Sequence, residues 1–467
     1  MALFLFGCAN QTYRPQPLEP ARVAAELGQR RADDDGLRSF MERHGFAAKE
    51  WPLQQWDLAA LTLMAVYFHP DMEVARANLD VERAGAITAG QRPNPRISPV
   101  VEHHSAASNG TIDTPWSIGL GLDIPIELGD KRAARIERAQ QLSEEARLSI
   151  AETAWKVRSR LRQRAIEVYA AETAAELSKR ELDVRSQEVA TLERRQKAGE
   201  VGPSEVTLAR LRLQETRLAA DGAEGNIRAA RAGLAEALGL PFDQVEHLPL
   251  DFATVAATES ETLPEDAAQQ AALQNRLDLR AAQARYGAAE ATLREEIARQ
   301  YPDLDLSPGF LWDQGDLIMS LSALFILPIL NNNEGPIAEA EAKRKLEAAR
   351  FMSLEAGVFA ELSTARVRYD AASKASNTAK GLVTQQAARL EETKKLIAFG
   401  EADRLSLIEA QIELIAAERA ASQAKISALQ AWGTLEDAVQ RPLDTGEAPE
   451  DLAKPAPAQA ENHEPPR

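Results

Sequence analysis

The side chains best suited to chemistry are six histidines and one cysteine, and their spacing argues against catalysis or metal binding. On the predicted helices, no histidine has a Glu or a second His at the spacing that zinc sites use. His103 and His104 are adjacent, so on a strand their rings point to opposite faces and cannot hold one ion. A glycine-rich phosphate loop is also missing from the sequence. We therefore predict no enzyme, no metal and no cofactor, and we expect energy to come from a partner protein.

Cys8 suggests a different chemistry, because it follows the short apolar run Leu5-Phe6-Gly7. The Leu three positions earlier and the adjacent Gly fit a bacterial lipoprotein signal, although Phe6 is unusual and a charged start is missing. A single cysteine forms no disulfide framework and no thiolate metal cluster. We predict that residues 1–8 are a partial lipoprotein signal and that Cys8 carries an N-terminal lipid. The alternative is a free thiol.

Charge and composition limit the partners. The chain has 71 Asp and Glu against 54 Lys and Arg, a formal net charge of −17. Such a chain is repelled by phosphate backbones, so we expect no nucleic acid, and a polar interior of this sign favours cations. No segment reaches the roughly 20 apolar residues of a membrane-spanning helix. Membrane attachment would therefore need strands or a lipid.

One turn motif occurs twice. Gly199-Glu200 is followed by Gly202, and Gly400-Glu401 is followed by Asp403 and Arg404. The two first glycines are 201 residues apart, which is far longer than a solenoid repeat. Each motif separates two long helical stretches, so we predict two helical hairpins with these turns as exposed tips.

Long helices fill most of each half. Residues 131–198 contain neither glycine nor proline, which allows a helix on the order of 100 Å long. Its apolar residues recur every three or four positions, at Ile150, Ala154, Val157, Leu161, Ala165 and Val168. A return helix is predicted from Ser204, as its N-cap, to Leu238, where Gly239 ends it. The second half repeats this plan up to about residue 439.

A pair of strands precedes each long helix. Small or polar residues alternate with apolar ones over 116–125, which is the period of a strand, and a partner is expected over 96–103. The second pair is expected around 303–312 and 318–327. The predicted order is helix, strand, strand, helix, helix, twice over.

These signals also predict the boundaries of the parts. After residues 1–8, an irregular N-terminal segment covers 9–56. The two structural repeats cover 57–240 and 265–440, and residues 241–264 connect them. Residues 441–467 form a Pro- and Glu-rich tail whose composition predicts disorder.

Four strands cannot close a membrane barrel, for which about eight is the minimum, and lipid does not tolerate open sheet edges. Either the strands form a small soluble sheet, or several chains pool them. Three chains would supply twelve strands and a ring of twelve long helical segments. The alternation of polar and apolar residues favours pooling. We therefore predict a mainly α protein with a small β part. It forms a long α-helical barrel and makes a four-strand contribution to a trimeric 12-stranded transmembrane β-barrel.

In this order, the motifs resemble those of the TolC-type outer-membrane efflux factors over about residues 57–440. The resemblance rests on 70–76 leading to 92–95, on Leu122-Asp123-Ile124-Pro125 and Leu327-Pro328-Ile329 before the long helices, and on the two tips. It implies a homotrimer in the bacterial outer membrane, in contact with its lipid and extending into the periplasm. A periplasmic adaptor and an inner-membrane pump would deliver substrates to this passive channel. Residues 61–70 resemble the heavy-metal efflux branch.

The resemblance also implies site residues. The tips, with Gly199, Glu200, Gly202, Gly400, Glu401, Asp403 and Arg404, would meet the adaptor. In the family, acidic residues just after the second tip narrow the closed pore, and the matching positions here are Ser406 and Glu409. Only Glu409 keeps the charge, so we expect one ring of three carboxylates. The alternative is that Glu409 is an ordinary solvated helix residue.

Two other functions fit parts of the sequence. A channel for type I protein secretion would have the same tube. A soluble coiled-coil scaffold would use the apolar stripes, but it leaves the duplicated strand pairs unexplained.

Overall fold

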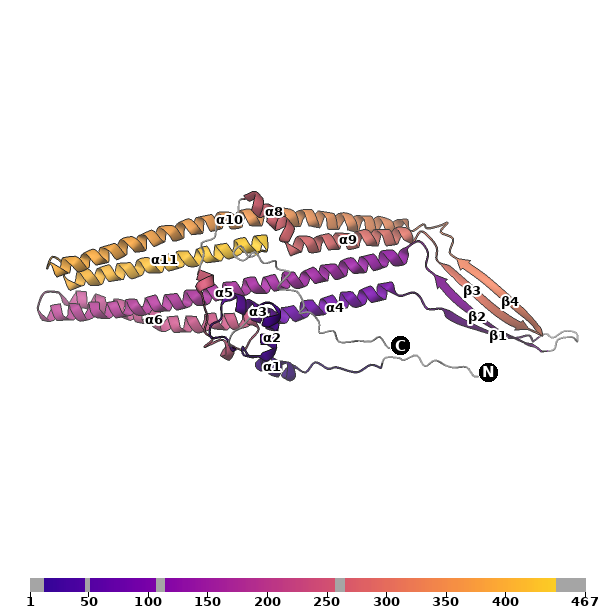
Figure 1. The fold of residues 1–467 in the computed structure, drawn as a ribbon, viewed down its shortest axis with the longest axis horizontal. Helices are drawn as coiled ribbons and strands as arrows, with labels where there is room; N and C mark the ends of the chain where they lie inside the picture. The colour runs from indigo at the N-terminus through magenta and orange to yellow at the C-terminus, as the bar shows by residue number, and fades with distance from the viewer. Residues whose placement is uncertain (1–11, 47–50, 106–113, 257–264, 442–467) are drawn as a thin grey trace.

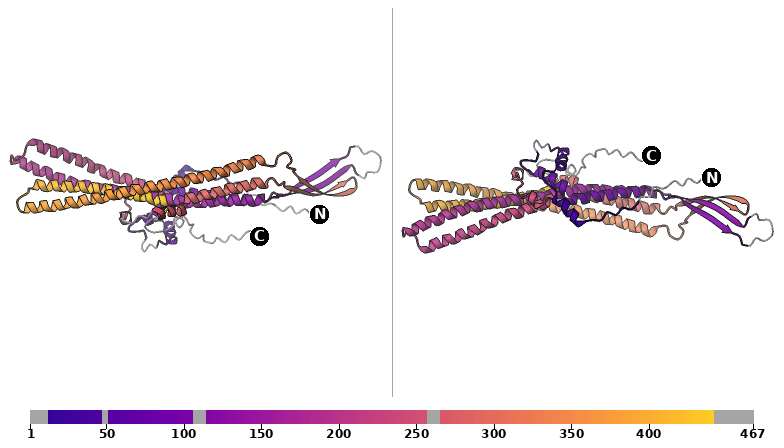
Figure 2. Two further views of the ribbon diagram at one scale, coloured as in Figure 1. Left: turned by 90° about the horizontal axis from the view of Figure 1, so that it is seen from above. Right: turned by 90° about the horizontal axis from the view of Figure 1, so that it is seen from below.

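The computed structural model describes residues 12–46, 51–105, 114–256 and 265–441. Cys8 with the predicted signal, and the predicted tail from residue 442 onward, lie outside the described residues. The molecule is elongated, with a small sheet at one end and the two helical tips together at the other (Figure 1). Short N-terminal helices lie against the middle of the helical body (Figure 2).

Each predicted repeat has the same order of elements. The N-terminal segment holds α1 (Pro20–Gly28) and α2 (Asp35–Arg43). The first repeat contains α3 (Leu58–Phe68), α4 (Pro70–Gly90), β1 (Arg96–His103), β2 (Trp116–Ile126), α5 (Lys131–Lys197) and α6 (Pro203–Leu238). A connection follows with the 3₁₀ turn η1 (Phe242–Gln244) and α7 (Ala253–Ala256). The second repeat contains α8 (Glu265–Asn275), α9 (Leu277–Ala298), β3 (Leu304–Asp313), β4 (Asp316–Phe325), α10 (Glu334–Ala398) and α11 (Arg404–Val439).

The long helices form where the apolar period predicts them. α5 has 67 residues and α10 has 65, and each pairs with its return helix. All six residues of the predicted α5 stripe, from Ile150 to Val168, are buried. None of the described helices combines the length and apolar character needed to cross a membrane.

One predicted cap is wrong. α6 begins at Pro203, with Gly202 as its N-cap, so Ser204 lies inside the first turn. Proline is favoured at the first helical position because its fixed φ suits the helix and its missing N–H would be unpaired there. Glu205 then accepts a bond from the Gly202 N–H at 3.4 Å.

The four strands form one antiparallel sheet in the order β1-β2-β3-β4. The central pair, β2 with β3, joins the two repeats and sets Gly121 opposite Gly309. The predicted alternation is confirmed on β2, where Ile118 and Leu120 are exposed and Ser117 is fully buried. An apolar face is thus left open to the surroundings.

The largest core lies at the middle of the molecule, around α3, which is not among the predicted helices. Eight of its 11 residues are buried, against α2, α5, α6 and the segment after α6. Such a helix has no polar face and therefore no amphipathic period, so the sequence pattern does not reveal it.

Buried charges join the two repeats where α5 packs on α11. Arg162 pairs with Glu436, which is 2% exposed, and donates to the Gly433 carbonyl at 2.6 Å. Arg162 also lies 3.0 Å from Asp437. A Cβ at position 433 would lie 2.8 Å from the Arg162 Nε, so this close approach needs glycine.

The two repeats carry opposite charges at one equivalent position of their long helices. This position lies beside the break between the first two helices of each repeat. In the first repeat Arg160 on α5 contacts His69 at 3.2 Å and Asp71 at 3.6 Å. In the second, Glu361 on α10 lies 201 positions after Arg160 and pairs with Arg276 at 2.8 Å. We call these the first and second junctions.

Candidate functional site

The two predicted tips have the same backbone geometry. Gly199 and Gly400 have φ values of 80° and 77°, in the left-handed region that favours glycine. The N–H of each following Glu donates to a carbonyl five residues back, at 2.9 Å for both Glu200 and Glu401. This closing bond satisfies a carbonyl at the end of the long helix and turns the chain sharply. Glu200 and Glu401 are exposed, so both turns are accessible at this end.

Asp403 holds the second tip together. Its Oδ1 accepts the Ser406 N–H at 2.8 Å and the Ser406 hydroxyl at 2.9 Å, which makes it the N-cap of α11. Its Oδ2 lies 2.5 Å from Arg195 at the end of α5, so the same carboxylate ties the two hairpins together. The Ser406 amide, and then the Ser406 hydroxyl and Arg195, lower the pKa of Asp403 to about 2.

The two expected gate residues are placed differently. Glu409 is exposed between the buried Ile408 and Ala410, so its carboxylate points away from the packing of α11. Ser406 is half-buried and bound to Asp403. A single chain does not bring three Glu409 side chains together, so the ring remains a proposal.

The polar face of the sheet carries a bridged carboxylate that was not among the predicted sites. Asp123 on β2 accepts hydroxyl bonds at 2.6 Å from Ser98 on β1 and from Ser307 on β3. Three strands are thus linked by one charged side chain. The alternating pattern puts Asp123 on the polar face, but the pairing with Ser307 depends on a contact across 184 residues.

A second polar link lies near the end of the sheet far from the helices. The Ser117 hydroxyl on β2 donates to Asp313 on β3, and His104 Nε2 lies 2.8 Å from the same hydroxyl. The His103 ring instead packs edge-on against Trp116 at 4.5 Å. The two histidines therefore point apart, as expected for adjacent strand residues. In the described part of the chain, no group of three or more His, Cys, Asp or Glu could hold a metal ion.

The comparison with protein families decides the identity. The family model for outer membrane efflux proteins matches residues 65–240 and 268–439, which cover both repeats. The chain belongs to the outer membrane efflux protein family. The predicted family resemblance is confirmed, and with it the predicted location in the outer membrane, extending into the periplasm.

A curated relative of this outer membrane efflux protein is the cobalt-zinc-cadmium resistance protein CzcC of Cupriavidus metallidurans. The two are 28% identical over 284 residues, which is 60% of this chain. The match spans 65% of the relative's length.

Solved structures share the fold. The outer membrane protein VceC of Vibrio cholerae is 19% identical, with a TM-score of 0.64 over 82% of this chain and 95% of that one. The open MtrE channel of Neisseria gonorrhoeae is 17% identical, with a TM-score of 0.63 over 82% of this chain and 88% of that one. The outer-membrane channel OprN is 17% identical, with a TM-score of 0.67 over 94% and 99%. The predicted fold class is confirmed.

Proposed function

We propose that three copies of this chain form one channel, which receives substrates from a periplasmic adaptor and an inner-membrane pump and releases them outside the cell. The channel is passive, with no reaction or cofactor of its own. Cys8 is our proposed site for an N-terminal lipid. The adaptor is proposed to bind the two tips, where the hairpins end in exposed turns.

The observation that carries this proposal is the open four-stranded sheet. Within the described chain, β1 and β4 each pair along one edge only. The apolar face of β2 is exposed from Trp116 to Leu122, and so is every residue of β4. Lipid does not tolerate unpaired edges. Three copies, each joining its β4 to the next copy's β1, would close a barrel of twelve strands with no free edge.

Divalent metal cations are the proposed substrate class. The relative CzcC is named for resistance to cobalt, zinc and cadmium. The polar face of the sheet carries Asp123 and Asp313, and the whole chain has a net charge of −17. Negative charge along a water-filled path raises the local concentration of cations.

Two measurements test the proposal separately. Native mass spectrometry of the detergent-solubilised protein should give the mass of three 51.0 kDa chains. A stable monomer without detergent would contradict the barrel.

The substrate class is tested in a strain that lacks the gene. Supplying the gene should restore growth in cobalt, zinc or cadmium, and leave sensitivity to organic drugs unchanged. Restored drug resistance alone would contradict the proposed substrate class, but it would not contradict the proposed trimeric channel. Restored secretion of a protein would indicate type I export instead.

A further inference from the structure

Within one chain, the two repeats meet where α9 packs on α5, and we call this contact the within-chain seam. A buried cluster joins the two helices at one end: Leu277 and Ala281 on α9, and Leu148 and Ala151 on α5. Three ion pairs join them nearer the sheet: Arg285–Glu145 at 2.5 Å, Arg294–Glu137 at 2.8 Å and Arg138–Glu295 at 3.3 Å. The within-chain seam is therefore apolar at one end and charged at the other.

The α9 residues of this seam include a regular stripe with spacings of four and three residues. Its six members are buried: Leu277, Ala281, Ala284, Ala288, Ala291 and Glu295. α4 is the counterpart of α9, 207 positions earlier, because the buried Met72 and Ala75 then match the buried Leu279 and Ala282. In this register the counterparts of the stripe on α4 are all exposed: Pro70, Val74, Ala77, Val81, Ala84 and Thr88.

The exposed stripe on α4 is mainly apolar. Val74 is 61% exposed, Val81 is 66% exposed, and Ile87, the counterpart of Arg294, is 70% exposed. These side chains lie on the side of α4 away from α5, since Met72 and Leu79 are buried in the core that α4 shares with α5. We define the α4 edge as Val74, Ala77, Val81, Ala84, Ile87 and Thr88.

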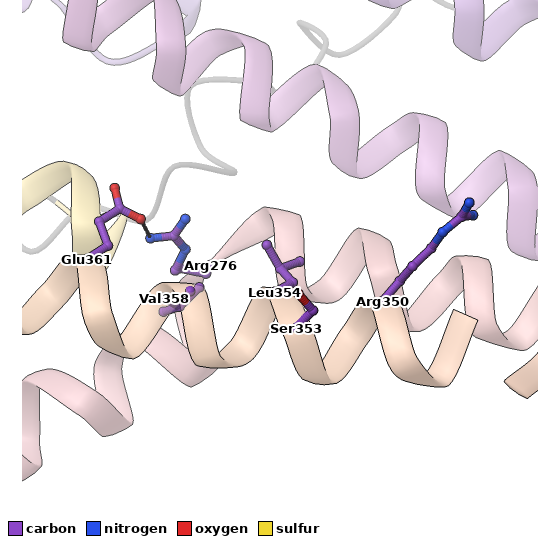
Figure 3. A pocket seen from close by; sticks show the side chains of 7 residues that line it. Arg276, Arg350, Ser353, Leu354, Val358 and Glu361 are labelled. Atoms are coloured by element: carbon purple, nitrogen blue, oxygen red, sulfur yellow. Dashed lines mark hydrogen bonds and ion pairs between the residues drawn. The ribbon is translucent and has the colours of Figure 1, made fainter. Parts of the chain in front are cut away.

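α10 is the counterpart of α5, 201 positions later. In this register three buried residues match three buried residues: Ala139, Val157 and Leu161 with Ala340, Val358 and Leu362. One side of α10 packs on α9, where Glu361 pairs with Arg276, the N-cap of α9, at 2.8 Å (Figure 3). The counterparts of the five α5 residues named above are all exposed, and we call them the α10 edge: Ala338, Glu339, Leu346, Ala349 and Met352.

The two edges lie on opposite flanks of one chain. α4 packs on α5, α5 on α9 and α9 on α10, so α4 and α10 are the outer members of a row of four helices (Figure 1). The α4 edge faces away from α5, and the α10 edge occupies the positions with which α5 contacts α9. A helix that completes the row beside α10 is therefore α4 of a second copy, in the place that α9 takes beside α5.

The two edges lack the same ion pairs. The counterparts of Arg285 and Glu145 are Asn78 and Leu346, and those of Arg294 and Glu137 are Ile87 and Ala338. Two separate solvent-facing surfaces have no physical reason to lack both members of the same pairs. Two surfaces that bury each other do, because burial costs an ion pair its hydration, whereas apolar side chains gain from leaving water.

We propose that the α4 edge of one copy packs antiparallel on the α10 edge of the next copy, as α9 packs on α5 within one chain. This between-chain seam rests on the proposed trimer and assigns the helical contact between its subunits. It is apolar at the positions where the within-chain seam is charged. Its free energy comes mainly from burying Val74, Val81, Leu346 and Met352, which are 48–66% exposed in the single chain.

Disulfide trapping tests the register of the between-chain seam. In a Cys8→Ala background, Val74→Cys with Ala349→Cys should form a disulfide between chains on mild oxidation, because their counterparts lie in one buried cluster. The product should be a covalent trimer on a non-reducing gel. The matched control is Val74→Cys with Val367→Cys. Val367 is 68% exposed on the same helix but about 27 Å further along, so this pair should form no disulfide.

Native mass spectrometry separates a failure of the seam from a failure of the channel. A trimer mass without any disulfide between chains, when Val74→Cys is combined with Ala349→Cys or with Met352→Cys, would overturn the seam and leave the trimeric channel. A disulfide within one chain would also overturn the seam. A monomer mass for the parent protein would contradict both proposals.

A charge placed in the seam gives an independent readout. Val74→Glu should lower the temperature at which the trimer dissociates in detergent by several degrees, because an unpaired charge is then buried. Adding Ala349→Arg should restore most of this loss, since a Glu–Arg pair then forms as in the within-chain seam. Ile297→Glu, at an exposed residue of α9 outside both edges, is the control and should change little. Equal dissociation temperatures for Val74→Glu and the parent would overturn the proposal.

Discussion

The stability of the second tip depends on the Asp403 side chain. Asp403→Ala removes the N-cap of α11 and the bond to Arg195, and cap loss costs about 1 kcal/mol. We expect about five-fold faster hydrogen exchange at residues 405–407, and a smaller effect in Asp403→Asn, since Asn also caps helices. Glu401→Gln in the same tip serves as the control and should change little. Equal exchange in Asp403→Ala and the parent would contradict the capping role.

The lowered pKa of Asp403 also predicts how the tip depends on pH. The folded pKa is about 2 and the ordinary value is 3.8, so the carboxylate stabilises the tip fully above about pH 4. This stabilisation is lost as the pH falls towards 2, because the protonated form no longer pairs with Arg195. Amide protection at the tip, corrected for intrinsic exchange, should stay level from about pH 7 to pH 4 and then fall. Loss of amide protection near pH 6 would mean that a titratable group other than Asp403 controls the stability of the tip.

Glu409 is expected to set ion preference if three copies bring it to the axis. Glu409→Gln should lower the cation-to-anion permeability ratio several-fold, and Glu409→Lys should reverse it, because the ring charge is removed or inverted. Single-channel recording in planar bilayers measures this ratio. Glu413→Gln is the matched control, since Glu413 lies on the same helix but pairs with Arg389. Unchanged selectivity in both Glu409 variants would favour the ordinary solvated residue.

Ser406 illustrates what the sequence revealed and what it did not. Its identity shows that position 406 has no carboxylate for a second acidic ring. The bond from its N–H to Asp403 could also have been predicted, because Asp is a favoured N-cap and its side chain accepts the N–H two or three residues later. The link from Asp403 to Arg195 could not, because it joins residues 208 apart in sequence. An Asp at position 406 would face the Asp403 carboxylate and weaken the cap.

Among the helices, the α5–α11 contact should be the most sensitive to loss of a charge. Glu436→Leu removes the buried one of the two carboxylates that pair with Arg162 and leaves Asp437, so the cost should approach but not exceed the about 3–5 kcal/mol of an unpaired buried charge. Glu413→Leu removes a carboxylate that is 43% exposed, and should cost under about 1 kcal/mol. Thermal unfolding of the detergent-solubilised protein should show a clearly lower midpoint for the first variant only. Similar midpoints would mean that the Arg162 network is not needed for stability.

Elements with a clear period were predictable, and those without one were not. The alternation over 116–125 and the apolar stripe from Ile150 to Val168 each arise because one face of the element is buried. β2 and α5 could therefore be predicted from the sequence. α3 is buried on nearly all sides, so its sequence has no polar face to define a period. The start of α6 was misplaced because Ser204 is a good cap in isolation, while Pro203 is better suited to the first helical position.

For the assembled channel, the position of the tips predicts where the adaptor binds. The α5–α6 and α10–α11 turns lie at the same end of the molecule, opposite the sheet (Figure 1), and Glu200 and Glu401 in these turns are exposed. Glu200→Cys and Glu401→Cys should therefore crosslink to the adaptor in living cells. Ser322→Cys on β4 is the control and should not crosslink. Crosslinks from Ser322→Cys alone would reverse the proposed orientation.

The opposite charges at the two junctions have a consequence for the origin and assembly of the channel. A single ancestral unit would have needed six copies to complete the ring, and all six edges would have been alike. After duplication, Arg160 and Glu361 diverged at the same position, so the two halves of one chain are no longer interchangeable. The proposed ring of three chains assembles head to tail in two association steps, where six separate units would need five. Duplication thus shortens assembly, and the opposite charges at the two junctions make the contact within a chain different from the contact between chains.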